Sequence, residues 1–284
     1  MSVPETHPRV HSTFSHVKNR YVVNSLETDL NALRASAPLV HNITNYVVMN
    51  FSANALLAVG ASPVMAHAVE EVEDMVGIAG ALVINIGTLS APWVQAMKLA
   101  LKKAADLKKP IVLDPVGAGA TNYRNVVLAE LLETAPPSLI RGNASEILAL
   151  AGLGGQTKGV DSTASSMNSL EAAQSLSERF GSVVSVSGAV DVIVQQNRVA
   201  YIENGHPLMT RVTGMGCSAS AIAGAFCAVQ QDAFQAAVTA ATTMGVCGEI
   251  AFRKATAPGS FQIAFLDALS ELTSEKLTEL ARIR

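Results

Sequence analysis

From residue 37 onward, short runs of apolar residues alternate with segments whose apolar residues recur at helical spacing. Each run is bounded by Gly, Pro or polar residues, which is typical of a buried strand. Continuously apolar strands separated by helices indicate an α/β fold with a mostly parallel sheet and helices on both faces. The predicted strands are residues 39–44, 61–66, 81–87, 110–116, 138–141 and 182–187, and the predicted helices between them include residues 50–59, 91–107, 126–134 and 170–180.

The second half of the chain continues with an antiparallel hairpin, predicted for residues 192–196 and 199–203. No internal repeat, low-complexity tract or evident linker interrupts the pattern, so residues 37–284 are predicted to form a single domain. Three long Ala-rich helices are expected near residues 217–230, 233–253 and 261–270.

The first 36 residues are polar and show little periodicity, and we expect an N-terminal extension followed by a helix around residues 25–36. The start of the chain lacks the apolar core of a signal peptide. Arg9, Lys18 and Arg20 occur there with few acidic residues, so an organellar transit segment is an alternative to a cytoplasmic location.

Composition narrows the classes of function. The formal net charge of −3 disfavours nucleic acid and anionic membranes as partners, because both reward a basic surface. No apolar run reaches the ~20 residues of a membrane span, and the longest, near residues 75–84 and 221–229, are predicted to be core. The three cysteines form no CxxC pair and no zinc-finger spacing, which favours a reducing, cytoplasmic environment.

Polar residues stand where the predicted strands end, and ligands of open parallel sheets bind beyond those ends. Asn85, Asp114, Arg141, Glu146 and Ser187 occupy or follow such positions. Each has an ordinary structural interpretation, such as a turn at Asp114 or a helix cap next to Glu146. Together they favour a functional site, since clustered buried charges are costly unless they are paired or bind a metal.

A glycine turn leads directly into the predicted helix of residues 217–230. Gly214 and Gly216 allow a tight turn, and the N–H groups of Gly214, Met215, Gly216 and Cys217 are expected to form an anion hole at the helix start. Such a hole suits a transferring phosphoryl group. The chain has no Walker A lysine pattern and no GxGxxG, which disfavours P-loop and Rossmann nucleotide sites.

Specific motifs run in order through most of the chain, and in these the sequence resembles the hydroxyethylthiazole kinase family. The resemblance implies a ribokinase-like three-layer α/β sandwich and transfer of the γ-phosphate of ATP to the hydroxyl of 4-methyl-5-(2-hydroxyethyl)thiazole, a salvage step of thiamine biosynthesis. The motifs are residues 38–45 (PLVHNITN), 53–58 (ANALLA), 60–65 (GASPVM), 113–118 (LDPVGA), 140–146 (IRGNASE), 159–162 (GVDS), 213–217 (TGMGC) and 258–261 (PGSF).

The resemblance also implies roles for individual residues, a homotrimer with active sites at subunit interfaces, and Mg²⁺ with ATP as co-substrate. Asn45, Met65 and Gly214 are expected around the thiazole, and Arg141 and Ser187 at ATP. Asp114 and Glu146 are expected to bind Mg²⁺ directly or through water. Cys217 is expected to be catalytic, as a base or as a group that orients the hydroxyl.

Three alternatives remain at the level of the sequence. The first is a ribokinase-like kinase for hydroxymethylpyrimidine, pyridoxal or a sugar, and the second is an ATP-dependent hydrate dehydratase on the same fold. Both usually have an aspartate at the position of Cys217. The third is a catalytically inactive binding protein, which the combination of Asp114, Arg141, Glu146 and the glycine turn disfavours.

Overall fold

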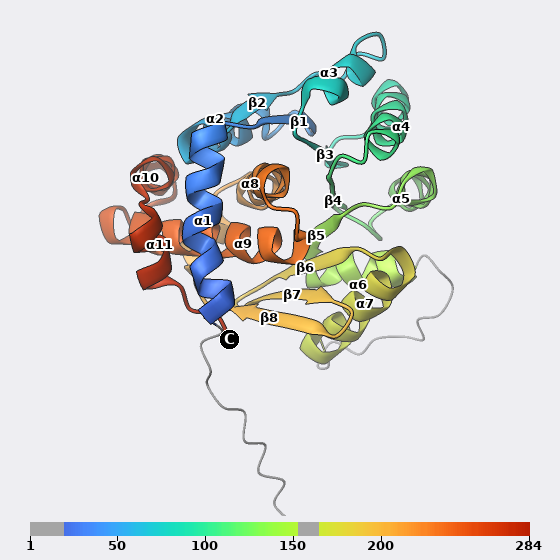
Figure 1. The fold of residues 1–284 in the computed structure, drawn as a ribbon. Coiled ribbons are helices and arrows are strands. Elements are labelled where there is room, and N and C mark those ends of the chain that lie inside the picture. Colours follow the sequence, from blue (N-terminus) through green and yellow to red (C-terminus); the bar gives the residue numbers. More distant parts are fainter. Residues whose placement is uncertain (1–19, 153–164) are drawn as a thin grey trace, which may run out of the picture.

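The computed structural model describes residues 20–152 and 165–284, which form a single mixed sheet between layers of helices (Figure 1). The strand order is β2-β1-β3-β4-β5-β6-β7-β8; the pairs from β2 to β6 are parallel, whereas β6–β7 and β7–β8 are antiparallel. The predicted parallel sheet and terminal hairpin are therefore confirmed. The strands are β1 (Leu39–Ile43), β2 (Ser62–Val64), β3 (Ala81–Asn85), β4 (Ile111–Asp114), β5 (Leu139–Asn143), β6 (Val183–Ser187), β7 (Asp191–Gln195) and β8 (Arg198–Ile202).

Helices cover both faces of the sheet (Figure 1). Helices α3 to α7 lie on one face, while α2, α8 and α9 lie on the other with α1, α10 and α11 packed beside them. The helices are α1 (Arg20–Ser36), α2 (Met49–Val59), α3 (Val72–Ile78), α4 (Ala91–Asp106), α5 (Asn122–Thr134), α6 (Ala144–Gly152), α7 (Ser165–Phe180), η1 (Pro207–Arg211), α8 (Met215–Val229), α9 (Ala233–Lys254), α10 (Pro258–Glu271) and α11 (Ser274–Leu280).

The sheet is apolar on both faces, which explains why its strands are continuous apolar runs. On β3, Leu82 and Ile84 belong to the core under α3 to α7, whereas Val83 belongs to the core under α8 and α9. Helix α8 lies very close to β3, because a Cβ atom at Gly224 would come within 2.5 Å of a methyl group of Val83. This contact sets the height of α8 above the sheet, and with it the position of the glycine turn that precedes α8.

Some element boundaries differ from the prediction. Helix α1 begins at Arg20 and α8 at Met215, both earlier than expected. The apolar run 75–84 is divided between two elements, because α3 ends at Ile78 and the chain turns at Gly80 before β3. Helices α3, α11 and η1 were not anticipated at all. The GVDS motif at residues 159–162 lies outside the described residues, as do the basic residues Arg9 and Lys18.

Two further features follow from the described part of the chain. Leu26, Leu30 and Leu33 of α1 are fully buried in the same core as α8 and α9. Within that part, none of the helices combines the length and the apolar character that crossing a bilayer requires. Cys227 and Cys247 are buried in α8 and α9, as expected of core residues.

Candidate active site

A chain of hydrogen bonds connects the carboxyl ends of β1, β3 and β4. Asn45, just beyond β1, donates its amide to Asn85 Oδ1 at 2.9 Å. Asn85 in turn donates to Asp114 Oδ2 at 2.8 Å, as expected for residues that are register partners in the parallel pair β3–β4. Ser220 of α8 donates to the same oxygen at 2.7 Å. All four side chains are buried, so this network fixes the sheet edge relative to α8.

Asp114 is a carboxylate in an unfavourable place for a charge. Burial and, less strongly, the nearby Glu146 outweigh the opposing effects of Arg141, Ser220 and Asn85, and together they raise the pKa of Asp114 to about 7. The second oxygen, Oδ1, is not used in the network described above. A buried carboxylate repelled by a second one is the arrangement that a bound cation stabilises.

The glycine turn forms the start of α8, as predicted. Gly214 is the N-cap residue with φ of +88°, and a Cβ atom there would lie 3.1 Å from a methyl group of Val48, so both conformation and space favour glycine. The N–H groups ahead of Ser218 have no acceptor within the helix. Arg141 of β5 donates to the carbonyl of Gly216 at 2.9 Å, which places a guanidinium beside this turn.

Cys217 lies in the first turn of α8 and is partly buried. Asn45 donates to its sulfur at 3.4 Å, so the structure brings together the predicted catalytic thiol and a predicted substrate residue. Burial raises the pKa of the Cys217 thiol and repulsion by Asp114 adds to this, outweighing Asn85, Asn45 and Arg141, which lower it. The thiol is therefore uncharged at neutral pH despite its position at a helix start.

Glu146 has a structural function as well as a position near the site. Its carboxylate accepts the N–H groups of Gly117 and Asn143, both at 2.9 Å. The side chain of Asn143 accepts the N–H of Glu146 at 3.0 Å, which completes a reciprocal cap at the start of α6. A helix cap next to Glu146 is thus present, with Asn143 as the capping residue, and Glu146 connects that cap to the loop after β4.

A cavity of about 540 Å³ lies beside the start of α8, and we call it the α8–α9 cavity. Arg141 and Ser187 line it together with Met215 and Gly216, so the two predicted ATP-binding residues face one space. Ser187 also donates to the carbonyl of Gly142 at 3.3 Å. Away from the charged end, the lining is small and apolar: Ala219, Ala223, Ala237, Ala240, Ala241, Met244 and Gly245.

Met65 is a predicted site residue that does not line the α8–α9 cavity. It follows β2, the edge strand, and is partly buried. Its carbonyl oxygen lies 3.3 Å from Nδ1 of His67, whose ring packs against Trp93. Met65 shares the carboxyl edge of the sheet with Asn45, but it is not among the residues that line the α8–α9 cavity.

Two residues of the site were not anticipated. Arg124 of α5 donates to the carbonyls of Ile86, Gly87 and Val116 at 2.5–2.8 Å, and so connects the loops after β3 and β4. Ser220 binds Asp114 across the sheet. Neither could be found from spacing alone, because the bonds to Ile86, Gly87 and Asp114 span more than 30 residues of sequence and both residues resemble ordinary helix residues.

Comparison with solved structures first defines the class of fold. The chain superposes on a ribokinase-like superfamily protein from Enterococcus faecalis V583 with a TM-score of 0.59 at 15% identity, over 86% of this chain and 89% of that chain. The sheet order, the helix layers and this likeness together identify the fold as ribokinase-like.

More similar proteins then identify the family. The model of the hydroxyethylthiazole kinase family matches residues 30–275. The structure of hydroxyethylthiazole kinase from Pyrococcus horikoshii OT3 has a TM-score of 0.86 at 42% identity and covers 92% of this chain and 98% of that chain. Hydroxyethylthiazole kinase from Leptospira biflexa serovar Patoc is 56% identical over 92% of this chain and 98% of its own length. The chain belongs to the hydroxyethylthiazole kinase family.

Proposed function

We propose that the carboxyl edge of this sheet carries out the family reaction, the ATP-dependent phosphorylation of the hydroxyl of 4-methyl-5-(2-hydroxyethyl)thiazole in thiamine salvage. The observation that carries the proposal is the meeting of Cys217, Asn45 and Asp114 at the start of α8, next to Arg141. Phosphoryl transfer depends mainly on positioning and charge stabilisation, and this site supplies both.

ATP occupies the α8–α9 cavity in this proposal. Arg141 and Ser187 bind its phosphates at the charged end, and the N–H groups of Gly214, Met215, Gly216 and Cys217 surround the transferring phosphoryl group. The apolar alanines of α8 and α9 at the other end suit a planar base. Arg141 already points to the turn through its bond with Gly216, so little rearrangement is needed.

Asp114 and Glu146 fit a Mg²⁺ site. Mg²⁺ prefers oxygen ligands and is usually bound by one or two carboxylates together with water and substrate phosphates. The described residues contain no group of three or more His, Cys, Asp or Glu side chains suited to a metal, which is consistent with an ion that depends on the nucleotide for its remaining ligands. When bound, Mg²⁺ would neutralise phosphate charge.

Asn45, Met65 and Gly214 surround the thiazole alcohol, and Cys217 orients its hydroxyl. An uncharged thiol with a raised pKa is a poor base, so orientation is the role that its environment supports. Asn45 holds the sulfur through its amide. Gly87 makes room for this amide, because a Cβ atom at Gly87 would lie 2.6 Å from Asn45 Nδ2.

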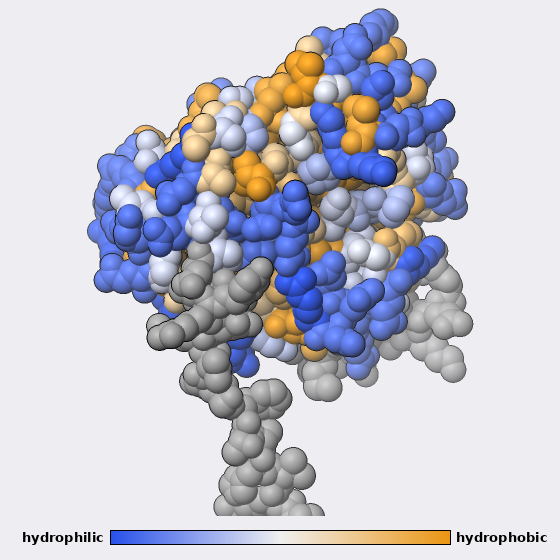
Figure 2. Space-filling model, in the orientation of Figure 1, coloured by the Kyte–Doolittle hydropathy of each residue, from blue (hydrophilic) through white to orange (hydrophobic). Residues whose placement is uncertain are grey.

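We further propose a cytoplasmic homotrimer with active sites at subunit interfaces. Tyr46 and Val47, which directly follow Asn45, are each 66% exposed, and β2 presents an unpaired edge next to Met65. Figure 2 shows hydrophobic residues gathered toward the upper edge of the visible face, where Figure 1 places β2 and α3. Exposed apolar surface beside a site is typical of an interface. Buried, unpaired Cys227 and Cys247 suit a reducing compartment.

The first test is ATP consumption with Mg²⁺ and four alcohols in parallel: hydroxyethylthiazole, hydroxymethylpyrimidine, pyridoxal and ribose. Turnover confined to the thiazole alcohol supports the proposal, whereas turnover of another alcohol alone contradicts the substrate.

Arg141→Ala should impair the use of ATP, and Cys217→Ala should lower turnover while Cys217→Asp preserves it. An inactive, folded Cys217→Asp variant would contradict the orienting role. Light scattering of wild type and of Val47→Glu tests the trimer.

A further inference from the structure

One wall of the α8–α9 cavity is a short segment without regular strand structure. Asn204, Gly205, His206, Pro207 and Met209 follow β8 and line the cavity. Asn204 and Gly205 lie between β8 and η1 and belong to neither, so their position depends on contacts with other elements. These contacts come from one face of α9 and from Leu280 and Arg282.

Helix α9 holds this wall with residues at helical spacing. Gly245, Gly248, Glu249 and Phe252 share one face of the helix. Glu249 Oε1 accepts the N–H of Gly205 at 2.8 Å and the amide of Asn204 at 3.3 Å.

The two glycines let the wall approach the helix axis. A Cβ atom at Gly245 would lie 2.6 Å from Asn204, and one at Gly248 would lie 2.3 Å from the sulfur of Met209. The ring of Phe252 stacks on that of His206 at 3.5 Å between centroids. The wall thus touches this face of α9 along its length.

The last residues of the chain complete the support. The N–H of Arg282 donates to Asn204 Oδ1 at 2.7 Å, and Asn204 donates to the carbonyl of Leu280 at 2.9 Å. The guanidinium of Arg282 binds both oxygens of Glu249, at 2.6 and 3.0 Å. Glu249 retains only 14% side-chain exposure, although Arg282 is half exposed. Burial alone would raise the pKa of Glu249, but the hydrogen bonds from Arg282 and Gly205 prevail and lower it.

We propose that Glu249 is a positioning residue for the nucleotide, and that Arg282 acts through it. Glu249 does not line the cavity itself, yet it fixes Asn204 and Gly205, which do. This inference rests on the proposed use of the cavity by ATP. According to this inference, Glu249 and Arg282, which lie outside the predicted site, determine the affinity for the nucleotide. They take no part in the transfer step or in binding the thiazole alcohol.

The test separates nucleotide affinity from turnover. ADP binding is measured by calorimetry, and KM for ATP, KM for hydroxyethylthiazole and kcat are measured in the assay above. Glu249→Ala should weaken ADP binding and raise KM for ATP about tenfold, because a buried N–H and amide lose a charged acceptor. The kcat at saturating ATP and KM for the thiazole alcohol should stay within about twofold of wild type. Glu249→Gln keeps the volume and one acceptor, so a smaller change is expected.

The matched control is Glu271→Ala, which removes an exposed carboxylate at the end of α10 that pairs with Lys254 of α9, and it should change none of these constants. Arg282→Ala should act in the same direction as Glu249→Ala, and the double variant should be no worse than Glu249→Ala alone. The inference is overturned if a folded Glu249→Ala variant binds ADP with normal affinity. It is also overturned if kcat falls and both KM values rise by similar factors. Failure of wild type to consume ATP would instead overturn the proposed function, and the two failures are therefore distinguishable.

Discussion

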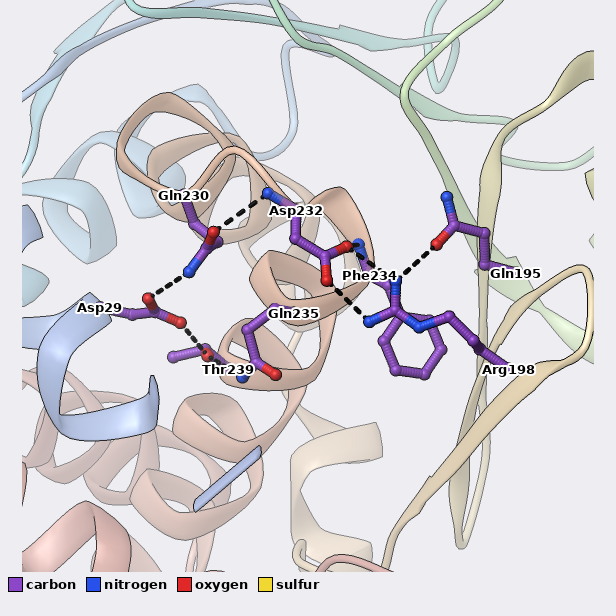
Figure 3. Close-up of polar contacts among 8 residues, drawn as sticks. All are labelled: Asp29, Gln195, Arg198, Gln230, Asp232, Phe234, Gln235 and Thr239. Carbon is purple, nitrogen blue, oxygen red and sulfur yellow. Dashed lines mark hydrogen bonds and ion pairs between the residues drawn. The ribbon is translucent and has the colours of Figure 1, made fainter. Parts of the chain in front are cut away.

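Two buried aspartates, Asp114 and Asp29, accept nearly the same hydrogen bonds but have different charged groups around them. Asp114 accepts an amide from Asn85 and a hydroxyl from Ser220 at 2.8 and 2.7 Å. Asp29 of α1 accepts an amide from Gln230 and a hydroxyl from Thr239, at 2.7 and 2.6 Å (Figure 3). Each aspartate is 3% exposed, and burial raises the pKa of both.

The charges around the two aspartates differ. Asp114 has Arg141 and Glu146 within electrostatic range and lies at the carboxyl edge of the sheet. Among the described residues, the charge that acts on Asp29 is that of Asp232, which repels it and is itself paired with Arg198 (Figure 3). Hydrogen bonds alone therefore do not distinguish a functional carboxylate from a structural one. The second carboxylate, the arginine and the nearby helix start make the difference at Asp114.

The largest expected effect is on catalysis. Asp114→Asn should lower kcat/KM by about 10²- to 10³-fold, because it removes a charge that would hold Mg²⁺ at the phosphates. The substitution keeps the side-chain volume and one acceptor and removes a carboxylate whose charge burial disfavours, so the variant should be at least as stable as wild type. Steady-state kinetics and urea unfolding check both parts. A folded variant with normal turnover would remove Asp114 from the site.

The second effect is on stability and concerns Asp29. Asp29→Ala should lower the free energy of unfolding by about 2–3 kcal/mol, because Gln230 and the fully buried Thr239 lose their acceptor. The kcat should remain that of wild type where the variant is folded, since Asp29 lies away from the carboxyl edge. Asp29→Asn, which keeps one acceptor, is the milder control. Loss of kcat in a folded Asp29→Asn variant would contradict the division between the two aspartates.

The comparison also shows what the sequence could predict. The apolar runs predicted the strands because buried parallel strands need no polar alternation, and the polar residues at their ends therefore stood out. The two glycines predicted a helix start, and Gly214 makes that turn with a positive φ that few other residues permit, whereas Gly216 lies inside α8. The contacts of Arg124 with Ile86 and Gly87 and the bond from Ser220 to Asp114 were not predictable, because they depend on how helices from distant segments pack against the sheet.

Asp29 was missed for the same reason. It occupies an ordinary position in a predicted helix, and its partners lie about 200 residues further along the chain. A polar residue in a helix is usually exposed, so the sequence gives no sign that this one is buried. The start of α1 at Arg20 was missed as well, because polar residues there obscured the helical period.

The third effect is a pH dependence that isolates Asp114. The native state holds a proton on Asp114 up to a pKa of about 7, whereas the unfolded state loses it near the ordinary value of 3.8. The native state thus binds more protons in this window, and its stability falls as pH rises toward the folded pKa. From pH 6 to 8, wild type without Mg²⁺ should lose about 1.4 kcal/mol more stability than Asp114→Asn.

Urea unfolding at both pH values in EDTA checks this difference. Asp29 is present in both proteins, so its own pH dependence cancels. Equal losses in the two proteins would show that Asp114 is ionised throughout and that its carboxylate is better stabilised than its burial indicates.

The smallest effect concerns Arg198, the cation that pairs with Asp232. Arg198 binds both oxygens of Asp232 at 3.1 and 2.7 Å and lies over the ring of Phe234, but it is 48% exposed (Figure 3). Arg198→Ala should therefore lower the free energy of unfolding by less than about 1 kcal/mol, because water screens the charge that Asp232 then presents to Asp29. Arg141→Ala, which removes the cation beside Asp114, should impair ATP use with little change in stability. Thermal unfolding and ATP turnover are measured for both variants. A loss of turnover in Arg198→Ala, or a larger loss of stability there than in Arg141→Ala, would mean that the Asp29 region is coupled to the active site.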